Sequence, residues 1–174
     1  MFTTDNFEKL HTPIESILRS VDPNRSFVVC DIDDTVLYPL LNGAEHPHGM
    51  FVRDTAVDMG IPVYYITARS ESPHGRKYAI QQLEFLGIES PVVIMRPPSV
   101  NTWVDISRYK KASRQMLEEV TGRVCIMNVG DQWTDLMQME SFNLPELMDD
   151  MFNNQYVLYK NNSDKCWSVK LVAM

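Results

Sequence analysis

Three aspartates stand at the end of an apolar stretch with the composition of a buried β-strand. Residues 27–30 read Phe-Val-Val-Cys, and Asp31, Asp33, Asp34 and then Thr35 follow. A short apolar run of this kind is typical of a central strand in an α/β sheet. Carboxylates at the end of such a strand need a positive partner, for example a divalent cation or a lysine. The alternative interpretation is an acidic, solvated turn.

A second acidic motif follows another apolar run, residues 124–129. Asp131 and Asp135 belong to the segment Gly-Asp-Gln-Trp-Thr-Asp. If the two strands are neighbours in a parallel sheet, both carboxylate groups meet at one edge, where ligands bind in open α/β sheets. Mg²⁺ is the favoured cation, because it takes oxygen ligands and keeps phosphate oxygens in its shell. N-capping of a following helix is the structural alternative for Asp131 and Asp135.

Two further residues have the chemistry to hold a phosphate. Thr67 ends an apolar stretch and is followed by Ala68 and Arg69, so a hydroxyl, backbone N–H groups and a guanidinium are available to phosphate oxygens. Lys110 and Lys111 lie in a helical segment from which one of the two can reach the acidic edge. Taken singly, Thr67 is a common strand-end residue and Lys110 a common surface charge.

The elements that position these residues alternate along the chain. Helices are expected at residues 6–21 (with Pro13 as an alternative start), 50–59, 75–86, 107–120 and 132–139, and strands at 27–30, 62–67, 91–95, 124–129 and 156–159. Strands separated by helices of this length imply right-handed crossovers and a mostly parallel sheet. The predicted fold is α/β, a three-layer, doubly wound, Rossmann-like sheet, and residues 1–174 are expected to form a single domain.

The order of these motifs resembles the haloacid dehalogenase (HAD) superfamily. The four matching motifs are Asp31-Ile32-Asp33-Asp34-Thr35, Thr67, Lys110 and Gly130-Asp131-Gln132-Trp133-Thr134-Asp135. More narrowly, Ile66-Thr67-Ala68-Arg69, Tyr109-Lys110 with Arg114, and Gly130-Asp131-Gln132-Trp133 are similar to the acid-phosphatase subgroup, subfamily IIIB, which includes plant vegetative storage proteins. The resemblance runs from about Phe27 to the last expected strand.

This resemblance implies a magnesium-dependent phosphomonoesterase acting on small phosphate esters. Asp31 matches the nucleophile that forms an aspartyl-phosphate, and Asp33 the general acid and base. Mg²⁺ would be held by the Asp31 side chain, the Asp33 main-chain carbonyl and Asp131, with Asp135 in support. Thr67 and Lys110, with Ala68 and Arg69, match the positions that bind the phosphate.

The segments in which HAD enzymes carry substrate-selecting caps are short here. Residues 36–60 form only a short segment, and residues 69–109 correspond mostly to a helix, a strand and a loop of the core. An essentially capless enzyme with an open site is therefore expected. His46, His48 and Arg69 are candidates for the edge of the pocket. For the two histidines, a plain loop is favoured over a zinc site, because no third ligand has suitable spacing.

Two other functions remain open from the sequence. A phosphatase acting on nucleotides or nucleic-acid ends suits an open site, but the net charge of −7 disfavours it. It would need a basic track, for which the candidates are Arg69, Arg76, Lys77, Arg96 and Lys110. A catalytically idle storage or binding protein on the same fold is disfavoured because every motif residue is retained.

The remaining composition is that of an ordinary globular protein. Cys30, Cys125 and Cys166 are widely spaced and form no CxxC pair, so they are interpreted as buried small side chains in a reducing compartment. Neither a signal peptide nor a membrane span is visible, which favours a cytoplasmic location and no membrane partner. The stretch after Lys160 is expected to close the sheet or to mediate homodimerisation.

Overall fold

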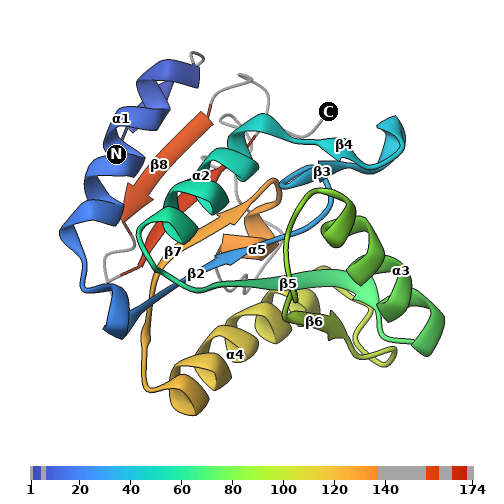
Figure 1. Cartoon of the computed structure of the whole chain (residues 1–174). Coiled ribbons are helices and arrows are strands. Elements are labelled where there is room, and N and C mark those ends of the chain that lie inside the picture. The colour runs from blue at the N-terminus through green and yellow to red at the C-terminus, as the bar shows by residue number, and fades with distance from the viewer. Residues whose placement is uncertain (1, 5–6, 137–155, 161–165, 172–174) are drawn as a thin grey trace.

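The computed structural model describes residues 2–4, 7–136, 156–160 and 166–171. Over these residues the chain forms a seven-stranded sheet in the order β1-β8-β9-β7-β2-β5-β6, with helices packed on both faces (Figure 1). The strands of this sheet are β1 (Phe2–Thr4), β2 (Ser26–Cys30), β5 (Val63–Ser70), β6 (Val93–Arg96), β7 (Val124–Gly130), β8 (Tyr156–Lys160) and β9 (Trp167–Lys170). The helices are α1 (Phe7–Ser20), α2 (Pro47–Asp58), α3 (Pro73–Phe85), α4 (Trp103–Thr121) and α5 (Trp133–Leu136), with short 3₁₀ turns η1 (Pro23–Arg25) and η2 (Pro39–Leu41).

The five strands β9, β7, β2, β5 and β6 run parallel, and β8 and β1 are added antiparallel at one edge. β2 lies between β7 and β5, with Cys30 opposite both Val129 and Tyr65. The segments that follow these three strands therefore emerge at the same edge of the sheet. This arrangement confirms the predicted α/β fold with a mostly parallel, doubly wound sheet.

After Ser26, the central strand β2 is apolar because both of its faces are covered. Val28 and Cys30 pack in the core on the α1, α2 and α3 side of the sheet, whereas Phe27 and Val29 pack with Leu117 of α4 on the other side. Alternate residues of a strand point to opposite faces, so a strand between two helical layers has no polar face. The continuous apolar run that marked this strand in the sequence is the result.

A small hairpin follows the first acidic segment. β3 (Leu37–Tyr38) pairs antiparallel with β4 (Ala44–Glu45) through η2, and the turn uses left-handed backbone at Asn42 and Gly43. His46, which is buried, accepts a hydrogen bond from the Gly49 backbone N–H through its Nδ1 (3.5 Å) and so caps α2. Within the described part of residues 36–60, this hairpin and α2 are the structured elements, in line with the minimal cap predicted.

Several element boundaries differ from the sequence-based expectations. α1 begins at Phe7 and contains Pro13, so Pro13 does not mark the start of the helix. α4 begins at Trp103, earlier than predicted, because Thr102 Oγ1 accepts a hydrogen bond from the Asp105 N–H (3.1 Å) and caps the helix. The strands β1, β3 and β4 were not predicted, and β9 was anticipated only as a stretch after Lys160 that closes the sheet.

The structure describes the predicted elements near the C-terminus only in part. The helix expected at residues 132–139 is α5 as far as Leu136, and its remainder lies outside the described residues. The last predicted strand is β8, and after it β9 returns parallel to β7 to close the sheet. In the parts of the chain that the structure describes, no helix has the length and apolar character needed to cross a bilayer.

Candidate active site

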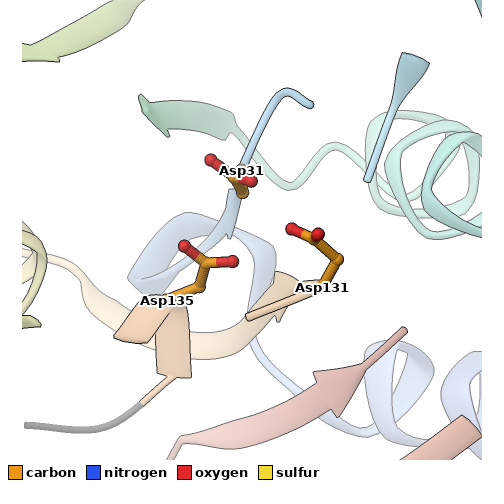
Figure 2. Close-up of side chains that lie close together, drawn as sticks. All are labelled: Asp31, Asp131 and Asp135. Carbon is orange, nitrogen blue, oxygen red and sulfur yellow. The ribbon is translucent and has the colours of Figure 1, made fainter. Parts of the chain in front are cut away.

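Three carboxylates converge at the edge where β2 and β7 end (Figure 2). Asp31 directly follows β2, Asp131 directly follows β7, and Asp135 lies on α5. One carboxylate oxygen from each lies within 4.8 Å of the others, and all three residues are buried. The placement of Asp31 is stabilised by a hydrogen bond from its backbone N–H to Val129 O (2.9 Å), which ties the end of β2 to the end of β7.

Lys110 of α4 supplies the positive charge next to this cluster. Its side chain is 2% exposed, and Nζ donates to Asp31 Oδ1 (2.8 Å) and also to Asp135 Oδ1. Burial by itself lowers the pKa of Lys110, but the attraction of Asp135 and Asp31 outweighs burial and raises the pKa above its ordinary value. Lys110 therefore remains an ammonium group between two aspartates.

One ammonium group does not balance three buried carboxylates. Burial, and then repulsion from Asp135 and Asp131, raise the pKa of Asp31 well above its ordinary value, although Lys110 opposes this shift. Burial and Asp135 raise the pKa of Asp131 to about 7. A divalent cation fits this excess of negative charge and these oxygen ligands, so the residues present suit a hard metal ion.

Asp135 is held in place by several donors. Its Oδ2 accepts from the Gln132 backbone N–H (3.0 Å), and its carbonyl oxygen accepts from Asn128 Nδ2 (2.8 Å) and Arg114 Nη1 (2.8 Å). Because Lys110 and Gln132 each engage one of its carboxylate oxygens, Asp135 is better placed to support Asp31 and Asp131 than to bind a cation directly.

Asp33 lies outside the carboxylate cluster. Its side chain is 34% exposed and forms a two-pronged ion pair with Arg69, from Nη2 to Oδ1 (2.6 Å) and from Nε to Oδ2 (2.9 Å). Arg69 also donates from Nη1 to Gln82 Oε1 (2.6 Å), and its guanidinium lies 5.9 Å from the centre of the Tyr78 ring. Burial opposes the charge on Arg69, but the hydrogen bonds and charge of Asp33 raise the Arg69 pKa above its ordinary value.

Thr67 stands between these two groups, within β5. It is buried, and its Oγ1 accepts a hydrogen bond from the Arg69 backbone N–H (3.1 Å). Its carbonyl accepts from the hydroxyl of Tyr109, the neighbour of Lys110 on α4 (2.9 Å). The next carbonyl, that of Ala68, accepts from Arg96 Nε (2.7 Å). Hydrogen bonds from Tyr109 of α4 and from Arg96 of β6 therefore hold the segment from Thr67 to Arg69 in place.

This arrangement is accompanied by a match to a known protein family. The family model for the HAD superfamily, subfamily IIIB (acid phosphatase), matches residues 44–152. The chain belongs to this family. It is therefore a phosphomonoesterase, which agrees with the activity expected from its motifs. No curated protein matches the chain.

The family match begins after the first of the four motifs and includes the other three. Thr67, Lys110, Asp131 and Asp135 lie inside the matched residues, whereas Asp31 and Asp33 precede them. The structure nevertheless brings Asp31 into contact with Lys110 and next to Asp131. The side chain of Asp33 approaches Arg69 instead, so it is not one of the three clustered carboxylates.

The basic residues considered for a nucleic-acid track are largely engaged within the phosphatase. Arg76 pairs with Glu71 (2.8 Å), Arg96 donates to Ala68 O and Val100 O, and Lys110 is buried. Arg69 is paired with Asp33, and Lys77 is the exposed member of the set that forms no ion pair with another described residue. These contacts give no support to a nucleic-acid substrate.

Sequence reasoning missed several residues that hold the phosphatase site together. Gln82 and Tyr78 lie four residues apart on one face of α3, where no motif distinguishes them from surface residues. Asn128 did leave a signal, because it is a polar residue within the apolar run of β7, and a buried amide in a strand requires partners. His46 and His48 lie at the start of α2 and not in the cluster of potential metal ligands found among the described residues.

Gly130 provides a test of how Asp135 is positioned. A Cβ atom at Gly130 would lie 2.4 Å from Asp135 Cβ and 2.5 Å from Asp135 Oδ2, so Gly130→Ala has to displace that side chain. We expect kcat for hydrolysis of an aryl phosphate to fall by about 100-fold, which is the typical effect of a misplacement of about 1 Å near reacting groups. Steady-state kinetics of the purified variant measure this effect.

Gly122→Ala is the matched control for this variant. Gly122 caps α4 with a φ of 67°, and a Cβ there meets no atom within 4 Å. It should therefore lower Tm through backbone strain and leave kcat unchanged. If Gly130→Ala has a native circular dichroism spectrum and wild-type kcat, the position of Asp135 does not matter for turnover.

Proposed function

We propose that this phosphatase is a magnesium-dependent phosphomonoesterase that hydrolyses small phosphate esters through an aspartyl-phosphate on Asp31. The observation that carries the proposal is the buried Asp31 carboxylate, 2.8 Å from Lys110 Nζ and beside Asp131 and Asp135. Lys110 orients this carboxylate and favours its charged form, and a bound cation would supply the further positive charge that keeps it ionised. Both properties are required of a nucleophile.

In the first step, a carboxylate oxygen of Asp31 attacks phosphorus and the ester oxygen leaves. Lys110 orients Asp31 and offers positive charge to the phosphoryl oxygens as their negative charge redistributes. Thr67 Oγ, the Ala68 N–H and Arg69 are the further donors that we assign to these oxygens. In the second step, water attacks the aspartyl-phosphate and regenerates Asp31.

Magnesium would be held by the Asp31 side chain, Asp131 and the Asp33 main-chain carbonyl, with Asp135 supporting them through Lys110. When bound, the ion supplies positive charge that offsets the repulsion between the Asp31 carboxylate and an anionic phosphate. The raised pKa values of Asp31 and Asp131 support this assignment, because they report a site with too little positive charge of its own.

Asp33 is assigned as the general acid that protonates the leaving oxygen and then as the base that activates water. In the unliganded protein its two oxygens are bound by Arg69. A substrate phosphate offers Arg69 a second anionic partner of suitable geometry, since guanidinium groups bind phosphate in the same two-pronged manner. We therefore assign Arg69 to the phosphate, with Asp33 released when substrate binds.

The leaving group is assigned to a groove that begins at Asp33. The groove has a volume of about 510 Å³ and is lined by Pro39, Arg69, Ser70, Gly75, Tyr78, Gln82 and Met95 in addition to Asp33. Sites for small molecules typically enclose about 300–1,000 Å³. Its size and its position beside the proposed general acid both favour a small organic phosphate.

Asp31→Asn tests the covalent mechanism. The variant keeps the shape of the side chain and removes the nucleophilic charge, so we expect turnover of an aryl phosphate to fall by roughly 10³-fold or more. Asp58→Asn makes the same change at an exposed position on α2 and should retain full activity. Acid quenching during turnover should leave a phosphoryl group on the wild-type peptide that contains Asp31. Wild-type turnover by Asp31→Asn would contradict the mechanism.

Removal of the metal tests the role of the carboxylate cluster. Chelation with EDTA should abolish activity, and Mg²⁺ should restore it. Independently of activity, Mg²⁺ at about 100 times its Kd should raise the Tm of the wild type by roughly 5–10 °C. Asp131→Asn should lose this shift and have an apo Tm no lower than that of the wild type, because one repelling carboxylate is gone. A Tm shift that persists in Asp131→Asn argues for a metal site elsewhere.

Arg69→Met tests the assignment of Arg69 to the phosphate. The loss of a two-pronged charged donor should raise KM by about 10-fold or more. Arg76→Met is the matched control, because Arg76 lies on the adjacent helix and pairs with Glu71 and the Val93 carbonyl. Both arginines contribute one ion pair, so a similar KM for the two variants would show that Arg69 has no special role in binding.

A further inference from the structure

Two cysteines that are 41 positions apart in the chain lie in contact beneath α4. Cys125 belongs to β7 and Cys166 precedes β9, and their Sγ atoms are 3.7 Å apart. Both residues are buried in the core cluster that also contains Phe27, Val29 and Leu117. Both are present as thiols. Sequence spacing gave no sign of this pairing.

An irregularity in β7 turns Cys125 towards Cys166. Opposite β2, Phe27 pairs with Cys125, but the next residue, Val28, pairs with Met127, so Ile126 is an extra residue in β7. An extra residue of this kind resets which face the following side chains occupy. Met127 pairs with Trp167 on one face of the sheet. Cys125, two residues before Met127, and Cys166, one residue before Trp167, share the other face.

The geometry of neighbouring strands suits a disulfide. Adjacent strands lie about 4.8 Å apart, which is within the Cα separation of about 4.4–6.8 Å found for disulfide-bonded cysteines. The Sγ atoms, now 3.7 Å apart, have to approach to about 2.05 Å for the bond to form.

A small cavity gives a reagent access to the pair. It has a volume of about 60 Å³, and its lining includes both cysteines together with Lys111, Arg114 and Glu118 of α4. A water molecule occupies about 30 Å³ in the liquid, so the cavity has room for a small oxidant such as hydrogen peroxide but not for a peptide thiol.

We propose that Cys125 and Cys166 are a redox modification site, at which hydrogen peroxide forms a disulfide between them. The Sγ of one cysteine attacks a peroxide oxygen, the O–O bond breaks, and a sulfenic acid and water form. The second Sγ then attacks the sulfenic sulfur, the S–O bond breaks, and a second water leaves. Two electrons pass from the two sulfurs to one peroxide, and the two thiol protons end in the two water molecules.

The third cysteine is not suited to this reaction. Cys30 is completely buried at the end of β2 and packs in the core on the α1, α2 and α3 side of the sheet, whereas Cys125 and Cys166 pack on the α4 side. Among the described residues it makes no contact with another cysteine. Cys30 thus serves as an internal control for the other two.

The disulfide would close a loop of the chain that carries part of the active site. Residues 126–165 lie between the two cysteines and include Asp131 and Asp135. Arg114 and Asn128, which bind the Asp135 carbonyl, line the same cavity as the cysteines. We therefore expect the oxidised protein to be more stable to unfolding, with unchanged kcat because Asp31 and Asp135 are held by Lys110 and by the Gln132 N–H, which the disulfide leaves in place.

Counting thiols tests the proposal directly. The native full-length protein is treated with hydrogen peroxide, denatured and alkylated with iodoacetamide. The oxidised chain should accept one alkyl group, at Cys30, whereas the chain reduced with dithiothreitol should accept three. Trypsin should release a linked pair of peptides, Val124–Lys160 and Cys166–Lys170. Alkylation of both Cys125 and Cys166 after oxidation, or a link through Cys30 or between chains, would overturn the proposal.

Thermal unfolding provides a second measurement. Oxidation should raise the Tm of the wild type by roughly 5–15 °C, an effect that dithiothreitol should reverse. Cys125→Ser and Cys166→Ala should lose the response, and Cys30→Ala should retain it. If either Cys125→Ser or Cys166→Ala fails to fold, the other still removes the pair, and if Cys30→Ala fails, the wild type remains the reference in which the pair is complete. An equal Tm for oxidised and reduced wild type contradicts a closed loop.

Discussion

The buried contact of Lys110 with Asp31 and Asp135 is the interaction on which the site depends. Lys110 comes from α4, whereas the two aspartates come from the end of β2 and from α5 after β7. An exposed pair such as Arg19 with Glu15 contributes at most about 1 kcal/mol. Loss of one partner from a buried pair costs about 3–5 kcal/mol, so the Lys110 contact fixes α4 against two segments of the sheet edge.

The same contact sets the electrostatics of the phosphatase. Lys110 offsets only part of the charge of three carboxylates, which leaves a negative site beside donors for an anion. Asp31 is 7% exposed in this cluster, whereas the Asp33 side chain is 34% exposed and opens onto the groove with Arg69. Two aspartates two positions apart thus have different surroundings, which is how one fold gives similar carboxyl groups different tasks.

Much of the fold followed from local patterns. The apolar runs of β2, β5, β6 and β7, and the helices between them, were predictable because these strands carry apolar side chains into the core and α2, α3 and α4 have N-terminal caps. β9 was not predictable in this way, because its four residues become a strand through pairing with β7 and β8. The helix predicted over residues 6–21 is α1, and only its alternative start at Pro13 was wrong, since tertiary packing of Leu10, Ile14 and Leu18 outweighs the local cost of a proline.

The sequence by itself determined the chemical types available and the strand ends on which they fall: Asp31, Thr67 and Asp131 each follow or end a recognisable apolar run. Only the tertiary structure decided the contacts between them. It separates Asp33 from the carboxylate cluster, joins it to Arg69, and places Cys125 beside Cys166. The physical reason is that periodicity records which face a residue occupies, whereas register, bulges and helix docking decide which distant residue lies opposite it.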